Sequence, residues 1–311
     1  MFGPFVLVTP LFAIVCVVVV TVVVHPRRRR LVAIDEVSYP QLADLRRTSQ
    51  AARLIAIVVG LVLAYLCSLA GALGRGVMLA PLVLAAVLVI GVLLGDLVSR
   101  GAARSADASA GVSAALGPRR VRDYAPRGLS RCVVAGTVTL AGLLAAGWAT
   151  ASSDDQGRAG RSLARCSVDG ASCAASGPYP GSFYAIPLLV ALIVVLLLAA
   201  VALVVTVGRP RNADPEIVRV DDVVRRRVAE SIVAAVGVGV GSALAGIAQA
   251  MAYPLVSTSF GLAVPLVSGI VCLVLSLAGI ALAGWSVSSL LVPGAARPRV
   301  DPSLPRQAQA A

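Results

Sequence analysis

Seven apolar stretches, each long enough to cross a bilayer as a helix, dominate this 311-residue chain. A hydrocarbon core about 30 Å thick needs roughly 20 helical residues. Hydrophobic residues make up 58% of the chain and charged residues only 14%, so the polar surface is too small to cover water-soluble domains. We therefore expect an all-α fold, a single membrane domain over 1–311 that forms a polytopic transmembrane helical bundle. The predicted spans are 5–24, 54–73, 77–98, 132–151, 184–207, 231–253 and 262–292.

The arginines predict the orientation of this bundle. Every one of the 27 basic residues is arginine, and the net charge is +12. If the N-terminus is outside, segments 25–53, 96–131, 208–230 and 293–311 are cytoplasmic and hold 7, 7, 6 and 3 arginines. The external segments hold the other four, which are Arg75, Arg158, Arg161 and Arg165. Because cytoplasmic loops carry the excess of Lys and Arg, this distribution predicts about seven spans with the N-terminus out and the tail 293–311 in.

The predicted external loop, 152–183, is the only sizeable hydrophilic segment outside. It contains Cys166 and Cys173, which are expected to form a disulfide because the environment outside the cytoplasm is oxidising. A bond across so few residues closes a short loop and stiffens it. The other four cysteines lie in or beside predicted spans and are expected to be small packing residues.

Residues 214–230 are predicted to form a helix along the membrane surface. Pro215 suits the first helical position, and Ile217, Val224 and Val228 then fall on one face. Arginines fall on other faces, and Arg225, Arg226 and Arg227 are expected to contact anionic lipid headgroups or a partner protein.

Glycines in the sixth predicted span indicate close helix packing. The run Gly237-Val-Gly-Val-Gly241 lies within an apolar helix and follows no strand, so a phosphate-binding loop is excluded. Gly237 and Gly241 have the small-xxx-small spacing that lets two membrane helices approach each other.

No catalytic, metal or cofactor signature stands out. Charged residues are absent from the middle of the predicted spans, and Asp96 and Glu230 fall at their cytoplasmic ends. The single histidine, His25, lies beside a proline at a membrane edge, and no Cys-x-x-Cys pair exists. We therefore expect no enzyme activity, no cofactor, no metal and no nucleic-acid partner.

Three short segments resemble hypothetical multi-span membrane proteins of actinobacteria. They read Asp154-Asp-Gln-Gly-Arg-Ala-Gly-Arg-Ser162, Gly177-Pro-Tyr-Pro-Gly-Ser-Phe183 and Asp221-Asp-Val-Val-Arg-Arg-Arg227. The resemblance covers roughly 120–250. It implies a bacterial inner-membrane placement and transfers no activity and no functional residue.

Transport is the leading hypothesis for function at this point, and the alternative comes from a different class. Several spans without a soluble catalytic domain fit a permease-like protein or a transport-accessory subunit, with a membrane-complex partner or a separate ATPase subunit. An external disulfide loop and internal arginine-rich loops fit a membrane sensor or interaction scaffold without catalysis. In either case the expected location is the inner (plasma) membrane, as a multi-pass protein in contact with anionic lipid headgroups.

Overall fold

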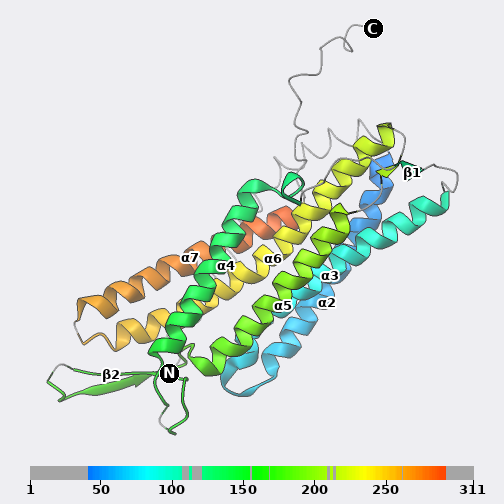
Figure 1. Cartoon of the computed structure of the whole chain (residues 1–311). Helices are drawn as coiled ribbons and strands as arrows, with labels where there is room; N and C mark the ends of the chain where they lie inside the picture. The colour runs from blue at the N-terminus through cyan, green and yellow to red at the C-terminus, as the bar shows by residue number, and fades with distance from the viewer. Residues whose placement is uncertain are drawn as a thin grey trace, which may run out of the picture.

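The computed structural model is a bundle of long helices (Figure 1). It describes residues 41–106, 112–113, 121–154, 156–167, 169–208, 211–212, 215–260 and 262–291. The helices are α2 (Gln41–Leu69), α3 (Arg75–Ala106), α4 (Arg127–Thr150), α5 (Ser182–Val207), α6 (Pro215–Ser257) and α7 (Ala263–Leu291). Short elements join them: η1 (Ala72–Gly74), β1 (Val112–Ser113), η2 (Val121–Asp123), β2 (Leu163–Cys166), β3 (Cys173–Ser176) and β4 (Arg211–Asn212).

All six of the longer helices in the described part of the chain are apolar and long enough to cross a membrane. They overlap the second to seventh predicted spans with shifted ends, so the expectation of an all-α bundle of helices able to cross a membrane is confirmed there. The first predicted span, 5–24, and the tail 293–311 lie outside the described residues. The candidate spans are Ser49–Leu69, Arg75–Ser99, Arg127–Thr150, Ser182–Val207, Asp221–Ser257 and Ala263–Leu291.

The predicted boundary between a surface helix and the sixth span is wrong. α6 runs without a break from Pro215 to Ser257, which makes it 43 residues long. At 1.5 Å per residue it measures about 65 Å, roughly twice the hydrocarbon thickness. The polar residues before 230 were interpreted as a separate element, yet a helix continues through polar sequence when neighbouring helices pack against it.

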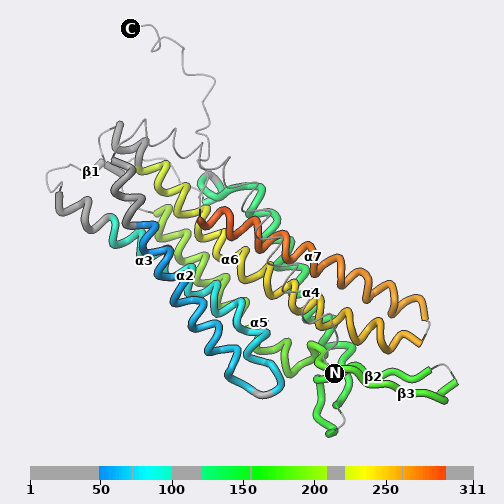
Figure 2. The backbone as a smooth tube through the Cα atoms, turned by 180° about the vertical axis from the view of Figure 1, so that it is seen from behind, coloured from blue at the N-terminus to red at the C-terminus, as the bar shows by residue number. Residues whose placement is uncertain are grey.

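α6 is the central helix of the bundle. It packs against α3, α4, α5 and α7, whereas α2 packs mainly against α3 at the outer edge. Every residue from 227 to 241 is buried. Figure 2 shows the same arrangement from behind, with α6 beside α7 and α2 beside α3.

Successive helices run in opposite directions, so the bundle has two distinct ends (Figure 1). We call one the hairpin end, because the α2–α3 turn, the α4–α5 loop and the α6–α7 turn meet there. The other is the arginine end, where α2, α4 and α6 begin and α3, α5 and α7 finish. The turn at η1 is tight because Leu73 (φ 59°) and Gly74 (φ 74°) both adopt left-handed backbone.

Candidate functional site: polar clusters at the two ends of the bundle

The hairpin end carries a small, ordered head built from the loop between α4 and α5. Strands β2 and β3 pair antiparallel, with Leu163 opposite Ser176 and Cys166 opposite Cys173. The Cys166 and Cys173 sulfurs lie at covalent bonding distance, so the predicted disulfide pairing is confirmed. The hairpin projects beyond the ends of the helices in Figure 1.

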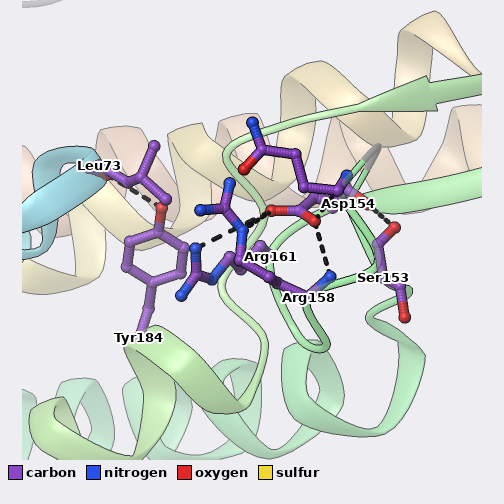
Figure 3. Close-up of polar contacts among 8 residues, drawn as sticks. Leu73, Ser153, Asp154, Arg158, Arg161 and Tyr184 are labelled. Atoms are coloured by element: carbon purple, nitrogen blue, oxygen red, sulfur yellow. Dashed lines mark hydrogen bonds and ion pairs between the residues drawn. The ribbon is translucent and has the colours of Figure 1, made fainter.

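Asp154 organises the base of this loop (Figure 3). Its Oδ1 accepts hydrogen bonds from the backbone N–H groups of Gln156 (3.0 Å) and Arg158 (2.8 Å). Its Oδ2 accepts from Arg158 Nε at 2.8 Å and lies 3.9 Å from a terminal guanidinium nitrogen of Arg161. Burial raises the pKa of Asp154, but the hydrogen bonds from Arg158 and Gln156 outweigh it, so the pKa lies below its usual value. The carboxylate is therefore ionised and fully engaged at neutral pH.

Two arginines lie against the ring of Phe183, the second residue of α5. The guanidinium carbon of Arg161 is 4.1 Å from the ring centroid, and that of Arg75, the first residue of α3, is 5.3 Å away. Such distances allow the cation to interact with the negative face of the ring. In Figure 3 the Arg161 guanidinium lies between Asp154 and the ring of Tyr184. We call Arg75, Arg161 and Phe183 the arginine–phenylalanine cluster.

Two tyrosines make hydrogen bonds that join elements at the hairpin end. The Tyr184 hydroxyl donates to the carbonyl of Leu73 at 2.9 Å, which joins α5 to the α2–α3 turn. The Tyr179 hydroxyl is 2.8 Å from that of Thr150 at the end of α4. Burial raises the pKa of Tyr179, so this phenol stays neutral at neutral pH. The loop is thus held to the end of α4, and the helix that follows it is held to the α2–α3 turn.

The arginine end holds a second cluster of polar side chains, and these are buried. Arg225 is 1% exposed, donates from Nε to Asp221 at 2.8 Å and donates to the carbonyl of Val207 at 3.1 Å. The Tyr124 hydroxyl donates to Asp222 at 3.2 Å, which ties the start of α4 to α6. Further buried polar residues near this end are Arg53, Asp96, Ser99, Thr206, Arg227, Glu230 and Ser231.

This burial corrects the predicted role of the α6 arginines. Arg225 and Arg227 were expected to contact lipid headgroups or a partner, but both are buried within the bundle. Only Arg226 is partly exposed. The reason is that α6 lies at the centre of the bundle, so neighbouring helices cover it at Arg225 and Arg227.

The two predicted packing glycines lie where α6 approaches its neighbours most closely. A Cβ on Gly241 would stand 2.7 Å from both the backbone nitrogen of Ala283 and the carbonyl oxygen of Gly279. A Cβ on Gly237 would collide with the hydroxyl of Ser286 and stand 3.0 Å from a methyl of Val133. Gly241 therefore requires a residue without a side chain, whereas at Gly237 the side chains of Ser286 and Val133 would have to move.

Three serines near the end of α7 have buried hydroxyls. Ser286, Ser288 and Ser289 are each 0% exposed, and none makes a side-chain hydrogen bond within the described structure. The sequence gives little indication of these buried hydroxyls. Serine is common in membrane helices, where its hydroxyl normally donates a hydrogen bond to a backbone carbonyl of the same helix. Among the described residues, no group of three His, Cys, Asp or Glu is placed to hold a metal ion.

Sequence reasoning did not find the arginine–phenylalanine cluster. Its members come from α3, the α4–α5 loop and α5, and Arg75 is more than 100 residues from Phe183. One available signal was the charge count itself. Arg75 breaks the arginine bias by standing alone between two spans on the arginine-poor side, and such an exception indicates a local role.

Comparisons with known proteins add no relative to this picture, because no family model, no curated protein and no solved structure matches the chain.

Proposed function

We propose that the chain is a multi-pass scaffold of the inner (plasma) membrane, without catalytic activity or cofactor, which presents the disulfide hairpin to a partner outside the cytoplasm. The observation that carries the proposal is the construction of the head. A covalent link closes the β2–β3 hairpin, and the loop is hydrogen-bonded to the end of α4. The first turn of α5, which follows the loop, is hydrogen-bonded to the α2–α3 turn. Binding surfaces presented on a rigid support lose little conformational entropy when a partner docks.

Packing along the middle of α6 also supports a scaffold over a permease. A transporter needs polar groups around a path near the bilayer midplane. Within the described structure, α6 from Ile232 to Gly241 consists of Ile, Val, Ala and Gly residues, all of them buried. A helix enclosed in this way holds the bundle together and leaves the two ends to make contacts.

The proposed orientation places the N-terminus and the hairpin outside, and the arginine end and C-terminus in the cytoplasm. It rests on the arginine bias, 23 of 27 residues on the proposed cytoplasmic side. In intact cells, we expect a membrane-impermeant maleimide to label Cys166 and Cys173 only after treatment with an impermeant phosphine reductant. Labelled mass is the readout, and the double Cys166→Ser, Cys173→Ser variant is the control. Labelling that requires cell lysis contradicts the orientation.

Partner binding through the hairpin is the central prediction of the scaffold proposal. In a shortened variant, a Gly-Ser turn replaces residues 165–174 and joins Ala164 to Ala175. These two residues are paired in the hairpin, so a short turn can connect them. We expect this variant to keep the elution volume of the wild type in mild detergent and to lose its stoichiometric co-purifying protein. Arg122→Gln, an exposed change at the arginine end, serves as the control and should retain it. An unchanged partner set in the shortened variant contradicts the proposal.

A permease-like or transport-accessory subunit is the second candidate. It is favoured by the buried carboxylates Asp96 and Glu230 and by the three buried serine hydroxyls of α7, because ionisable and polar groups inside a membrane protein often mark ion pathways. A separate ATPase subunit would then be the partner, bound at the arginine end. Flux across reconstituted vesicles that is lost in Asp96→Asn would favour this function over the scaffold.

A further inference from the structure

The arginine–phenylalanine cluster carries positive charge at the depth where the helices enter the membrane. Arg75 begins α3 and Phe183 lies in the first turn of α5, and both helices are apolar from those points onward. Side chains at such positions lie at the headgroup level of a bilayer.

The charges of this cluster are not balanced within the described structure. Asp154 is committed to Arg158 through a 2.8 Å side-chain bond, and it is 3.9 Å from Arg161. The Nε of Arg161 is buried without a hydrogen-bond partner. Among the described residues Arg75 has no hydrogen bond or ion pair from its side chain, and its described contact is the ring of Phe183. Asp154 is therefore shared by Arg158 and Arg161, and Arg75 lies against the same ring as Arg161 without a carboxylate partner among the described residues.

Exposed apolar residues border this charge. Leu73 is 52% exposed, Val77 on the other side of Arg75 is 59% exposed, and Ile186 in the first turns of α5 is 47% exposed. In a membrane these side chains face acyl chains. The cluster is thus the junction of an unbalanced positive charge and a lipid-facing apolar surface.

We propose that the arginine–phenylalanine cluster binds the phosphate of an anionic phospholipid headgroup, whose acyl chains lie along the exposed faces of α3 and α5. Guanidinium groups pair with phosphate through two parallel hydrogen bonds. The N–H groups of the Arg75 guanidinium make no hydrogen bond to the described residues and can therefore donate to a phosphate. Arg161 supplies a second charge on the same ring. A lipid is favoured over a free anion because the exposed apolar residues adjoin the charge directly.

The arginine positions are fixed before any lipid binds. The Tyr184–Leu73 hydrogen bond joins the first turn of α5 to the turn that precedes Arg75. The backbone of Arg161 is held by its carbonyl, which accepts from the N–H of Tyr179 at 3.0 Å. A pre-organised site loses less entropy on binding. The inference is independent of the scaffold proposal and of which side of the membrane the hairpin end occupies.

Thermal unfolding of the full-length chain in neutral detergent tests the site. We expect phosphatidylglycerol to raise the unfolding midpoint, and phosphatidylcholine with the same acyl chains to have little effect. In Arg75→Gln the half-maximal concentration of phosphatidylglycerol should increase about fivefold, the factor expected for one arginine near an anionic headgroup. Arg122→Gln, with the same charge change at the opposite end, should behave like the wild type.

Each other result overturns the inference. Equal midpoints with phosphatidylglycerol and phosphatidylcholine would exclude a preference for anionic lipid. Equal stabilisation by inorganic phosphate would show that the cluster binds a free anion and not a lipid. Equal phosphatidylglycerol dependence of Arg75→Gln and Arg122→Gln would show that Arg75 is not part of a binding site. If Arg75→Gln does not fold, Arg75→Lys keeps the charge and loses the planar fork. It should weaken the phosphatidylglycerol effect about twofold, the smaller change expected when a bidentate contact becomes a point charge, and an unchanged effect would again overturn the site.

Discussion

Gly241→Ala is expected to separate α6 from α7 and to destabilise the bundle by about 2 kcal/mol, within the range of over-packed interiors. The new Cβ would lie 2.7 Å from the Gly279 carbonyl oxygen and the Ala283 nitrogen. Both atoms belong to the backbone of α7, so no side-chain rotation can relieve the contact. The helices must move apart, and packing over this interface is lost because membrane helices associate through close van der Waals contact.

Gly246 on the same helix provides a matched control for this substitution. It is exposed, and a Cβ added there would meet no atom within 4 Å. Gly246→Ala is therefore expected to be neutral or to stabilise by up to about 1 kcal/mol through helix propensity. Unfolding titrations with sodium dodecyl sulfate in mixed micelles compare the two variants. Equal stabilities would contradict the close α6–α7 contact.

Arg225→Ala is expected to have the largest effect of any single substitution considered, a loss of about 3 kcal/mol. This is the lower end of the range for removing one partner of a buried ion pair, because the Asp221 side chain is 30% exposed. Arg225 is 1% exposed and connects Asp221 on its own helix to the Val207 carbonyl at the end of α5. The substitution would leave a carboxylate and a carbonyl without this donor and would open a gap between α5 and α6. The same titration measures it.

The adjacent residue again supplies the control. Arg226 is partly exposed, although its Nε is buried without a hydrogen-bond partner in the described structure, so Arg226→Ala should cost about 1 kcal/mol, less than Arg225→Ala. Arg225→Lys should fall between the two, because lysine keeps the charge but cannot donate in two directions from one planar group. A loss for Arg225→Ala as small as that for Arg226→Ala would contradict the buried bridge.

These stability effects matter for any functional test at the arginine end. Neutralising Arg225, Arg226 and Arg227 together would be an obvious way to search for a docking surface there. Since Arg225 and Arg227 are buried, loss of a partner in that variant would report unfolding of the bundle. The hairpin replacement is the better test because it removes exposed residues and keeps the pairing of Ala164 with Ala175.

The arginines show how far a sequence can indicate a site. Counting them along the chain gave an orientation to test, and it placed Arg75 with three other arginines on the arginine-poor side. It did not reveal that Arg75 and Arg161 share the ring of Phe183, or that Arg225 points into the bundle. Those facts depend on which helices are neighbours, and loop lengths and charge runs do not determine that.

The sequence by itself determined the positions of the six long apolar helices in the described part of the chain and which two cysteines pair. Both are local properties, since a run of about 20 apolar residues needs a bilayer whatever its neighbours are. Only the tertiary structure decided that α6 is continuous and central and that its arginines are buried. The physical reason is that lipid is as apolar as the interior of a helical bundle, so the buried and lipid-facing sides of a span carry similar residues and their periodicity does not separate them.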